Sequence, residues 1–380
     1  MFRHRGVGSL VAIVVLAAGS PAWGQLGVGP QGELLRDGKP YRGIGVNYFS
    51  CFLRTLASGD DRSYEQGFQT LAEKGIPFAR FCAAGFWPRD MRLYQTDREE
   101  YFRRLDRVVE AAGKQGVGLI PSLFWYAACV PDLVGEPLDQ WANPASKTRA
   151  WMRDYVREVV TRYRDNPTIW AWEFGNEYSL SANLPNAAQH RAKIVPALGT
   201  ASARTERDDL TFPMVRDALA AFGEEARRHD PRRVVESGDS FLRPSAWHQL
   251  HDGNWKVDSP EQSAEILAMV NPAPVDVVSI HMYEDNDQRL VRTLEAARRL
   301  GKPVFVGEFG AEGQGPAAEA KFRRLLAAIV DHDVPLAALW VFDHPHQRDW
   351  TVTSSNARAW QLDAVGEANR RLRAGRGGAD

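Results

Sequence analysis

The stretch TIWAWEFGNE, residues 168–177, is an apolar run that ends in a paired amide and carboxylate, Asn176 and Glu177. A short apolar run bounded by polar residues is typical of a buried strand in a parallel sheet. Similar runs recur along the chain and bring the predicted strands to eight. The other seven are YRGIGVNYF (41–49), PFARFC (77–82), VGLIPSLFW (117–125), RVVESG (233–238), VDVVSIHMY (275–283), PVFVGEFG (303–310) and PLAALWVF (335–342).

Amphipathic stretches lie between these runs, for example residues 98–116, 148–166 and 288–303, with apolar residues at helical spacing. Strands that alternate with helices indicate a parallel sheet, and eight such units favour a closed (β/α)₈ TIM barrel, an α/β fold, over a doubly wound sheet. No Gly-x-Gly-x-x-Gly follows the first strand, which argues against dinucleotide binding.

The ends of the chain differ from this pattern. Residues 1–24 hold a basic head, a short apolar run and a small-x-small site before Gln25, and this predicts a secretory signal peptide, with an uncleaved anchor as the alternative. We expect one catalytic domain over residues 26–373 and a polar tail over 374–380. The predicted location is therefore the periplasm or the medium.

Composition limits the classes of partner. The 380 residues are 44% apolar and carry a net charge of -1, so the chain can bury a large core but has no charge excess for nucleic acid or an anionic membrane. Cys51, Cys82 and Cys129 allow either one disulfide with one thiol left over or three unpaired thiols, and their spacing does not resemble a metal site.

A second carboxylate, Glu308, ends the seventh predicted strand as Glu177 follows the fourth. In a barrel both lie at the carboxyl ends of the strands, where such folds carry their reactive groups. Two carboxyl groups about 5–5.5 Å apart are what retaining glycoside hydrolysis requires. Glu173 lies four strand residues before Glu177, roughly 13 Å away, so we expect a hydrogen-bonded core acid there.

Several strand-end residues together resemble glycoside hydrolase clan A, and most closely its family 5 of cellulases and β-mannanases. The motifs run in order over residues 41–345 and comprise Arg80, Asn176-Glu177, His281-x-Tyr283, Glu308 and Trp340. One position departs from the family, because members usually carry a histidine at the end of strand three and this chain has Leu123-Phe124-Trp125. That departure bears on the substrate more than on the mechanism.

The resemblance implies a role for each matching residue. Glu177 would be the acid/base, Glu308 the nucleophile, and Asn176 the partner of the sugar 2-hydroxyl. Trp340 would be the sugar platform, since a flat ring matches the C–H face of a pyranose. The expected substrate-binding set is Arg80, Asn176, His281, Tyr283, Trp340, Asn47 and Trp125.

Long connections follow the third, fourth and fifth predicted strands, at 126–147, 178–212 and 239–260. In a barrel they lie on the carboxyl-end face, where they are expected to form walls for an extended ligand. Tryptophans in the loops of that face are candidates for further sugar subsites, although each one alone is more typical of packing. They are Trp125, Trp141, Trp247, Trp255 and Trp350.

Other functions have less support. A metal site would draw on Asp343, His344 and His346, with His248 and His251 nearby. Two histidines in a polar loop are usually solvated surface, and spacing places no third ligand beside such a pair, so no metal or other cofactor is predicted. A non-catalytic sugar-binding barrel would be expected to lack one carboxylate, and a serine hydrolase would need a Gly-x-Ser-x-Gly elbow, which does not occur.

The sequence therefore predicts a secreted retaining glycoside hydrolase that acts on a β-linked polysaccharide or oligosaccharide. β-Mannan is the first choice of substrate, with endo action favoured. Endo-β-glucanase and exo-acting β-glycosidase activities are the alternatives.

Overall fold

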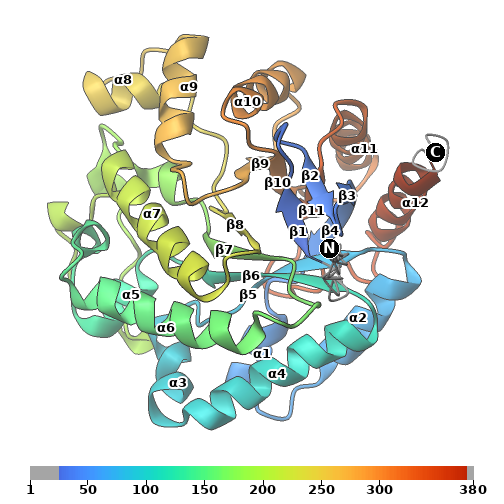
Figure 1. Cartoon of the computed structure of the whole chain (residues 1–380), viewed down its shortest axis with the longest axis horizontal. Coiled ribbons are helices and arrows are strands. Elements are labelled where there is room, and N and C mark those ends of the chain that lie inside the picture. Colours follow the sequence, from blue (N-terminus) through green and yellow to red (C-terminus); the bar gives the residue numbers. More distant parts are fainter. Residues whose placement is uncertain (1–24, 375–380) are drawn as a thin grey trace, which may run out of the picture.

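The computed structural model describes residues 25–374, in which eight parallel strands form a barrel surrounded by helices (Figure 1). The strands neighbour one another in the order β8-β7-β6-β5-β4-β11-β10-β9, and a single parallel bridge between Glu236 and Val277 joins the two ends of the sheet. The predicted TIM barrel is confirmed, with every strand inside its predicted range. The strands are β4 (Gly43–Asn47), β5 (Phe78–Cys82), β6 (Gly118–Phe124), β7 (Ala171–Gly175), β8 (Val234–Glu236), β9 (Val278–Met282), β10 (Val304–Phe309) and β11 (Leu336–Leu339).

Helices cover the outside of the barrel and extend the loops at its carboxyl-end face. The α-helices are α1 (Cys51–Ala57), α2 (Ser63–Glu73), α3 (Arg92–Thr96), α4 (Arg98–Lys114), α5 (Cys129–Val134), α6 (Lys147–Tyr163), α7 (Phe212–His229), α8 (Ala246–His251), α9 (Pro260–Met269), α10 (Asp287–Arg299), α11 (Pro316–Asp331) and α12 (Trp360–Ala374). Short 3₁₀ helices are η1 (Pro88–Met91), η2 (Leu138–Ala142), η3 (Tyr178–Ser181), η4 (Ala187–Gln189), η5 (Pro196–Leu198) and η6 (Glu206–Asp208).

A small antiparallel sheet that the sequence did not predict precedes the barrel. Its strands are β1 (Leu26–Val28), β2 (Leu34–Arg36) and β3 (Lys39–Pro40), which are too short to show a hydrophobic period. Leu26 and Leu34 pack with residues from the beginnings of the barrel strands, including Phe78 and Trp170. The sheet therefore closes the amino-end opening of the barrel and leaves the carboxyl-end face as the open one.

Two sequence predictions concern cysteines and membrane segments. Cys51, Cys82 and Cys129 are all free and buried, so of the two alternatives the structure has three unpaired thiols and not a disulfide. Within residues 25–374 no helix is both long and apolar enough to cross a bilayer. The predicted signal peptide, residues 1–24, lies outside the described residues.

The last helix is fastened to the first barrel strand by one buried amide. The Asn369 side chain on α12 accepts a hydrogen bond from the Ile44 backbone N–H at 2.9 Å and donates one to the Ile44 carbonyl at 2.8 Å. In β4 only Val46 and Asn47 pair with β5, so the amide supplies the partners that β5 does not offer at Ile44. Asn369 itself is 2% exposed.

Replacing Asn369 with alanine is expected to lower the free energy of unfolding by about 2 kcal/mol or more, because two buried backbone groups lose their only side-chain partner. Urea unfolding followed by circular dichroism measures the change. Arg370→Ala, one residue along on the exposed surface of α12, is the matched control and is expected to cost under about 0.5 kcal/mol. Equal effects of the two substitutions would contradict this role of Asn369.

Candidate active site

Residues predicted at the strand ends converge at the carboxyl-end mouth of the barrel. Parallel strands end on the same side, and closure of the sheet brings residues from distant parts of the sequence together. Glu177 follows β7, while Glu308 lies in β10 in register with His281 of β9. One oxygen of each carboxylate and one nitrogen of His281 all lie within 4.8 Å of one another.

His281 links the two carboxylates. Its Nδ1 lies 2.8 Å from Glu177 Oε1 and 3.5 Å from Glu308 Oε2. Burial lowers the pKa of the imidazole to about 4, so His281 is neutral at neutral pH. A neutral ring with its proton on Nδ1 donates to an ionised Glu177, and a neutral ring with its proton on Nε2 accepts at Nδ1 a hydrogen bond from a protonated Glu177. The same contact thus serves both charge states of Glu177.

Arg80 is the cation beneath the two carboxylates. It is fully buried in β5 and donates to Glu308 at 2.8 Å, to Glu173 at 2.7 Å, to Asn47 at 2.9 Å and to Asn176 at 2.8 Å. A guanidinium presents five donors in a fixed plane, so one side chain sets the positions of four acceptors. Arg80 therefore fixes the orientation of residues from β4, β7 and β10 and of Asn176, which follows β7.

The face of the Arg80 guanidinium is covered by an aromatic ring. Its central carbon lies 4.1 Å from the centre of the ring of Trp125, the residue that follows β6. A tryptophan there attracts the cation through its ring and excludes water from it. Trp125 therefore shields the buried charge of Arg80 from solvent, which a smaller polar side chain would do less well.

Burial raises the pKa of both carboxyl groups, but different neighbours oppose the rise at each one. Burial raises the pKa of Glu308, and the charge of Glu177 adds to that rise. Arg80 and the hydroxyl of Tyr283, which donates to Glu308 at 2.5 Å, oppose it. Burial also raises the pKa of Glu177, and Arg80 opposes the rise only from a distance. Glu308 thus has two direct donors to its ionised form, Arg80 and Tyr283. The carboxylate of Glu177 has no cation in direct contact among the described residues, and only the charge of Arg80 and a hydrogen bond with Ser240 oppose the rise in its pKa.

Glu177 owes its direction to an unusual backbone conformation. Its φ is 56°, in the left-handed region that a side chain with a Cβ rarely adopts, and its N–H donates to the carbonyl of Gly238 at 3.1 Å. The next turn, η3, is held by residues that follow β8. Ser179 hydrogen-bonds to the buried Asp239, and Arg243 donates to carbonyls of η3. The loop after β8 therefore stabilises the turn that presents Glu177.

An open cleft of about 1460 Å³ lies above the carboxylates. Of the predicted substrate-binding residues, Asn176, Tyr283, Trp125 and Trp340 line it together with Glu177 and Glu308. Trp340 is held in place by a hydrogen bond from its ring nitrogen to Gln347 at 2.7 Å. Phe49, which no motif singled out, packs edge-on against Trp125 and also lines the cleft.

Three residues predicted to bind substrate lie below the cleft wall. The side chains of Arg80, His281 and Asn47 are buried, and they do not line the cleft. Asn47 accepts from Arg80 and donates to the carbonyl of Gly307 at 2.8 Å, so both ends of its amide are occupied. The prediction of direct sugar contact is wrong for Asn47, because the interior of the barrel uses this amide to orient Arg80.

The loop tryptophans divide between the cleft and the core. Trp350 and Trp125 line the cleft, whereas Trp141 is 1% exposed and donates to the carbonyl of Ala127 at 2.8 Å within the core. Trp247 and Trp255 are not among the residues that line the cleft. Packing therefore explains Trp141.

Glu173 and the aromatic residues of β7 point to opposite faces of the strand. Glu173 is fully buried and hydrogen-bonded to Arg80, as expected of a core acid. The rings of Trp172 and Phe174, on the same strand, belong to the core between the strands and the helices. Alternate residues of a strand point to opposite faces, and these two point outward.

Among the described residues, neither of the two histidine clusters, His344 with His346 and His248 with His251, forms a group of metal ligands. Within residues 25–374 the side chains that converge closely enough to hold a cation are Glu177, His281 and Glu308. His248 instead hydrogen-bonds to Asp258 at 2.8 Å, and His344 packs against Phe49. The prediction that no metal is needed remains one for experiment.

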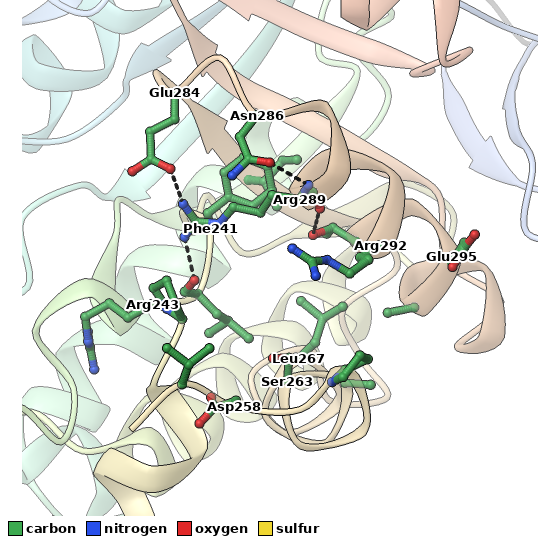
Figure 2. Close-up of a pocket in the computed structure, with 18 of the residues that line it drawn as sticks. Phe241, Arg243, Asp258, Ser263, Leu267, Glu284, Asn286, Arg289, Arg292 and Glu295 are labelled. Carbon is green, nitrogen blue, oxygen red and sulfur yellow. Dashed lines mark hydrogen bonds and ion pairs between the residues drawn. The ribbon is translucent and has the colours of Figure 1, made fainter. Parts of the chain in front are cut away.

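A second, smaller pocket of about 230 Å³ lies beside α9 and α10. Figure 2 shows Arg289 crossing it, stacked 4.5 Å from the centre of the Phe241 ring and paired with Glu284 at 2.7 Å. Arg292 and Glu295 of α10 lie at its edge. It contains neither Glu177 nor Glu308, so the large cleft is the candidate active site.

Comparison with known proteins agrees with this geometry. A mannan endo-1,4-beta-mannosidase 7 of rice (Oryza sativa subsp. japonica) is 26% identical over 324 residues, which cover 73% of this chain and 75% of that protein. A "Probable mannan endo-1,4-beta-mannosidase F" of Aspergillus flavus is 42% identical over 238 residues, or 58% of this chain, and the match spans 44% of its length.

Solved structures share the fold. The crystal structure of an endo-1,4-beta-mannanase from Rhizomucor miehei superposes with a TM-score of 0.66 at 18% identity and covers 92% of this chain and 99% of its own. The family model for cellulases, glycosyl hydrolase family 5, matches residues 36–342. Because this match extends over nearly the whole barrel, the chain belongs to glycosyl hydrolase family 5 and is a glycosidase.

Proposed function

We propose that the protein is a retaining endo-β-1,4-mannanase that works by double displacement. The observation that carries the proposal is the convergence of Glu177 and Glu308 in an open cleft, with carboxylate oxygens within 4.8 Å of each other. Retaining enzymes place their carboxyl groups about 5–5.5 Å apart, whereas inverting enzymes leave room for a water between them. The names of the relatives supply mannan as the substrate.

Glu308 is the nucleophile in this proposal. Its two oxygens accept separately from Arg80 and Tyr283, which favour the ionised form that attack on the anomeric carbon requires. Both donors also orient the carboxylate. When Glu308 forms the glycosyl ester its charge disappears, and both hydrogen bonds weaken with it.

Glu177 is the acid and then the base. Burial raises its pKa, which favours the proton that the leaving oxygen must receive. Each of the two carboxylates raises the pKa of the other while both are charged, as Glu177 does for Glu308. Loss of the Glu308 charge in the intermediate therefore lowers the pKa of Glu177 and prepares it to remove a proton from water.

The cleft supports an extended substrate. Trp340, with Trp125 and Phe49 packed beside it, gives the cleft an aromatic wall suited to pyranose rings. Asn176 accepts from Arg80 through its amide oxygen, which leaves its amide nitrogen to hydrogen-bond a sugar 2-hydroxyl. An open cleft favours internal cleavage of a chain over removal of terminal units. We further infer export of the enzyme from the signal-like residues 1–24.

The first test is hydrolysis of a substrate panel in the presence of EDTA. β-Mannan, β-glucans, xylan and aryl β-glycosides are incubated with the purified protein, and reducing ends and product sizes are followed. Mixed mannan oligosaccharides are expected. Cleavage of β-glucan but not of mannan would show that the substrate is β-glucan. Release of terminal units alone would show exo action instead of endo action. Loss of activity on addition of EDTA would contradict the prediction that no metal is required.

Removal of each carboxylate is expected to give a distinct result. Glu308→Ala should lower kcat by about 10⁴-fold or more, and azide should restore turnover with inverted product, since a small anion then occupies the place of the nucleophile. Glu177→Ala should spare aryl glycosides with very good leaving groups, which need no proton, while mannan hydrolysis is lost. Product anomers by NMR and rates on both substrate types measure this. Azide rescue with retention in Glu308→Ala would reverse the assignment.

Tyr283→Phe is expected to move the acid limb of the kcat/KM profile to higher pH. The hydroxyl stabilises ionised Glu308, so its removal raises the pKa of Glu308, and the nucleophile is then protonated over a wider range of acid pH. Tyr163→Phe removes a comparable hydroxyl-to-carboxylate bond, to Asp106 at 2.7 Å on the outer helices, and should leave the profile unchanged. An unshifted limb in Tyr283→Phe would contradict the role given to this hydroxyl.

A further inference from the structure

A pair of buried acids lies in the barrel beneath the proposed catalytic residues. Glu173 of β7 and Glu236 of β8 are paired in register and are 0% and 1% exposed. Glu236 ends the three-residue strand β8 and forms, with Val277, the bridge that closes the barrel. Neither the proposed acid/base nor the proposed nucleophile is part of this pair.

The hydrogen bonding of the pair is complete only if it holds a proton. Glu173 accepts from Arg80 through Oε2, while Glu173 Oε1 and Glu236 Oε1 have no donor among the residues that the structure describes. The register of β7 and β8 sets the two residues opposite each other, and burial followed by the charge of Glu173 raises the pKa of Glu236 well above its usual range. A proton on Glu236 provides the missing donor.

The surroundings leave Glu236 without a cation of its own. The charged groups that act on it are Glu173 and then Arg80, and its bridge partner, just before β9, is the apolar Val277. Gly238, with φ of 67°, leaves the space for the pair, because a Cβ there would lie 2.8 Å from Glu173 Oε1. An ionised Glu236 would therefore be a buried charge without a direct counter-ion.

Charge balance during the reaction gives the pair a function that rests on the proposed mechanism. Arg80 is shared between Glu173 and Glu308, and Glu308 loses its charge when the glycosyl ester forms. Arg80 would then be an uncompensated buried cation unless Glu173 stayed ionised. A second negative charge on Glu236 would instead raise the pKa of Glu308 and protonate the nucleophile.

We propose that Glu236 is a positioning residue that keeps its proton through the catalytic cycle and donates it in a hydrogen bond to Glu173, so that Glu173 remains the permanent counter-ion of Arg80 while Glu308 loses and regains its charge. No proton leaves the pair in either half of the reaction.

Glu236→Gln tests the protonation state, because an amide keeps the shape, the neutrality and the donor of a protonated carboxyl. The variant is expected to fold, to keep kcat/KM on the best substrate of the panel within about three-fold, and to keep the pH profile. If Glu236 were ionised, its loss would lower the pKa of Glu308 and move the acid limb to lower pH. Such a shift, or failure of this variant to fold, would overturn the proposal.

Glu236→Leu is the matched disruptive variant, of similar size but without a donor. Glu173 then loses the donor that orients its carboxylate toward Arg80, so the charge of Arg80 acts more fully on Glu308 and lowers the pKa of Glu308. The expected result is a fall in kcat of about ten-fold or more with the acid limb moved to lower pH, restored by Gln at the same position. A profile equal to that of the unchanged enzyme would overturn the proposal.

Infrared spectroscopy without substrate separates this inference from the proposed function. At neutral pH the unchanged protein should show the carbonyl band of a protonated carboxyl group that Glu236→Gln lacks, and absence of that difference would overturn the proposal. If the band is present but no member of the panel is hydrolysed, the proposed function is wrong, while the protonation of Glu236 is supported.

Discussion

The buried charge of Arg80 is the constraint on which the site depends. A guanidinium without solvent must find its counter-charges and acceptors within the barrel, and it finds them on β4, β7 and β10 and in the residue that follows β7. These contacts fix Asn176 beside the cleft and Glu308 at its floor. Trp125 covers the same cation from above, so the aromatic wall and the electrostatics share one anchor.

Closure of the barrel brings these groups within reach of one another. Glu177 and Glu308 are separated by most of the chain's second half, yet β7 and β10 face each other across one mouth. The closure between β8 and β9 consists of one bridge, and the loop after β8 holds η3 through Asp239 and Arg243. The short strand β8 therefore supports both the acid pair below the site and the turn that presents Glu177.

Predictions from sequence were most accurate where a pattern is local. The eight strands are visible as apolar runs, and the carboxylates and aromatic residues at their ends follow from the rule that barrel sites lie at the carboxyl ends. The small sheet β1 to β3 was missed because strands of two or three residues carry no period. Asn47 was misplaced because its strand-end position does not reveal that Arg80 and Gly307 occupy both ends of its amide.

The sequence by itself determined the order of strands and helices, the family, and which acids and tryptophans are available at the strand ends. Only the tertiary structure decided which acids share a cation, which share a proton and which face the cleft. Glu173, Glu236 and Glu308 are all acids in apolar strands, and their positions along those strands do not reveal which side chains lie opposite each other or share Arg80. Their protonation depends on burial and on distances between strands, and those distances exist only once the sheet has closed.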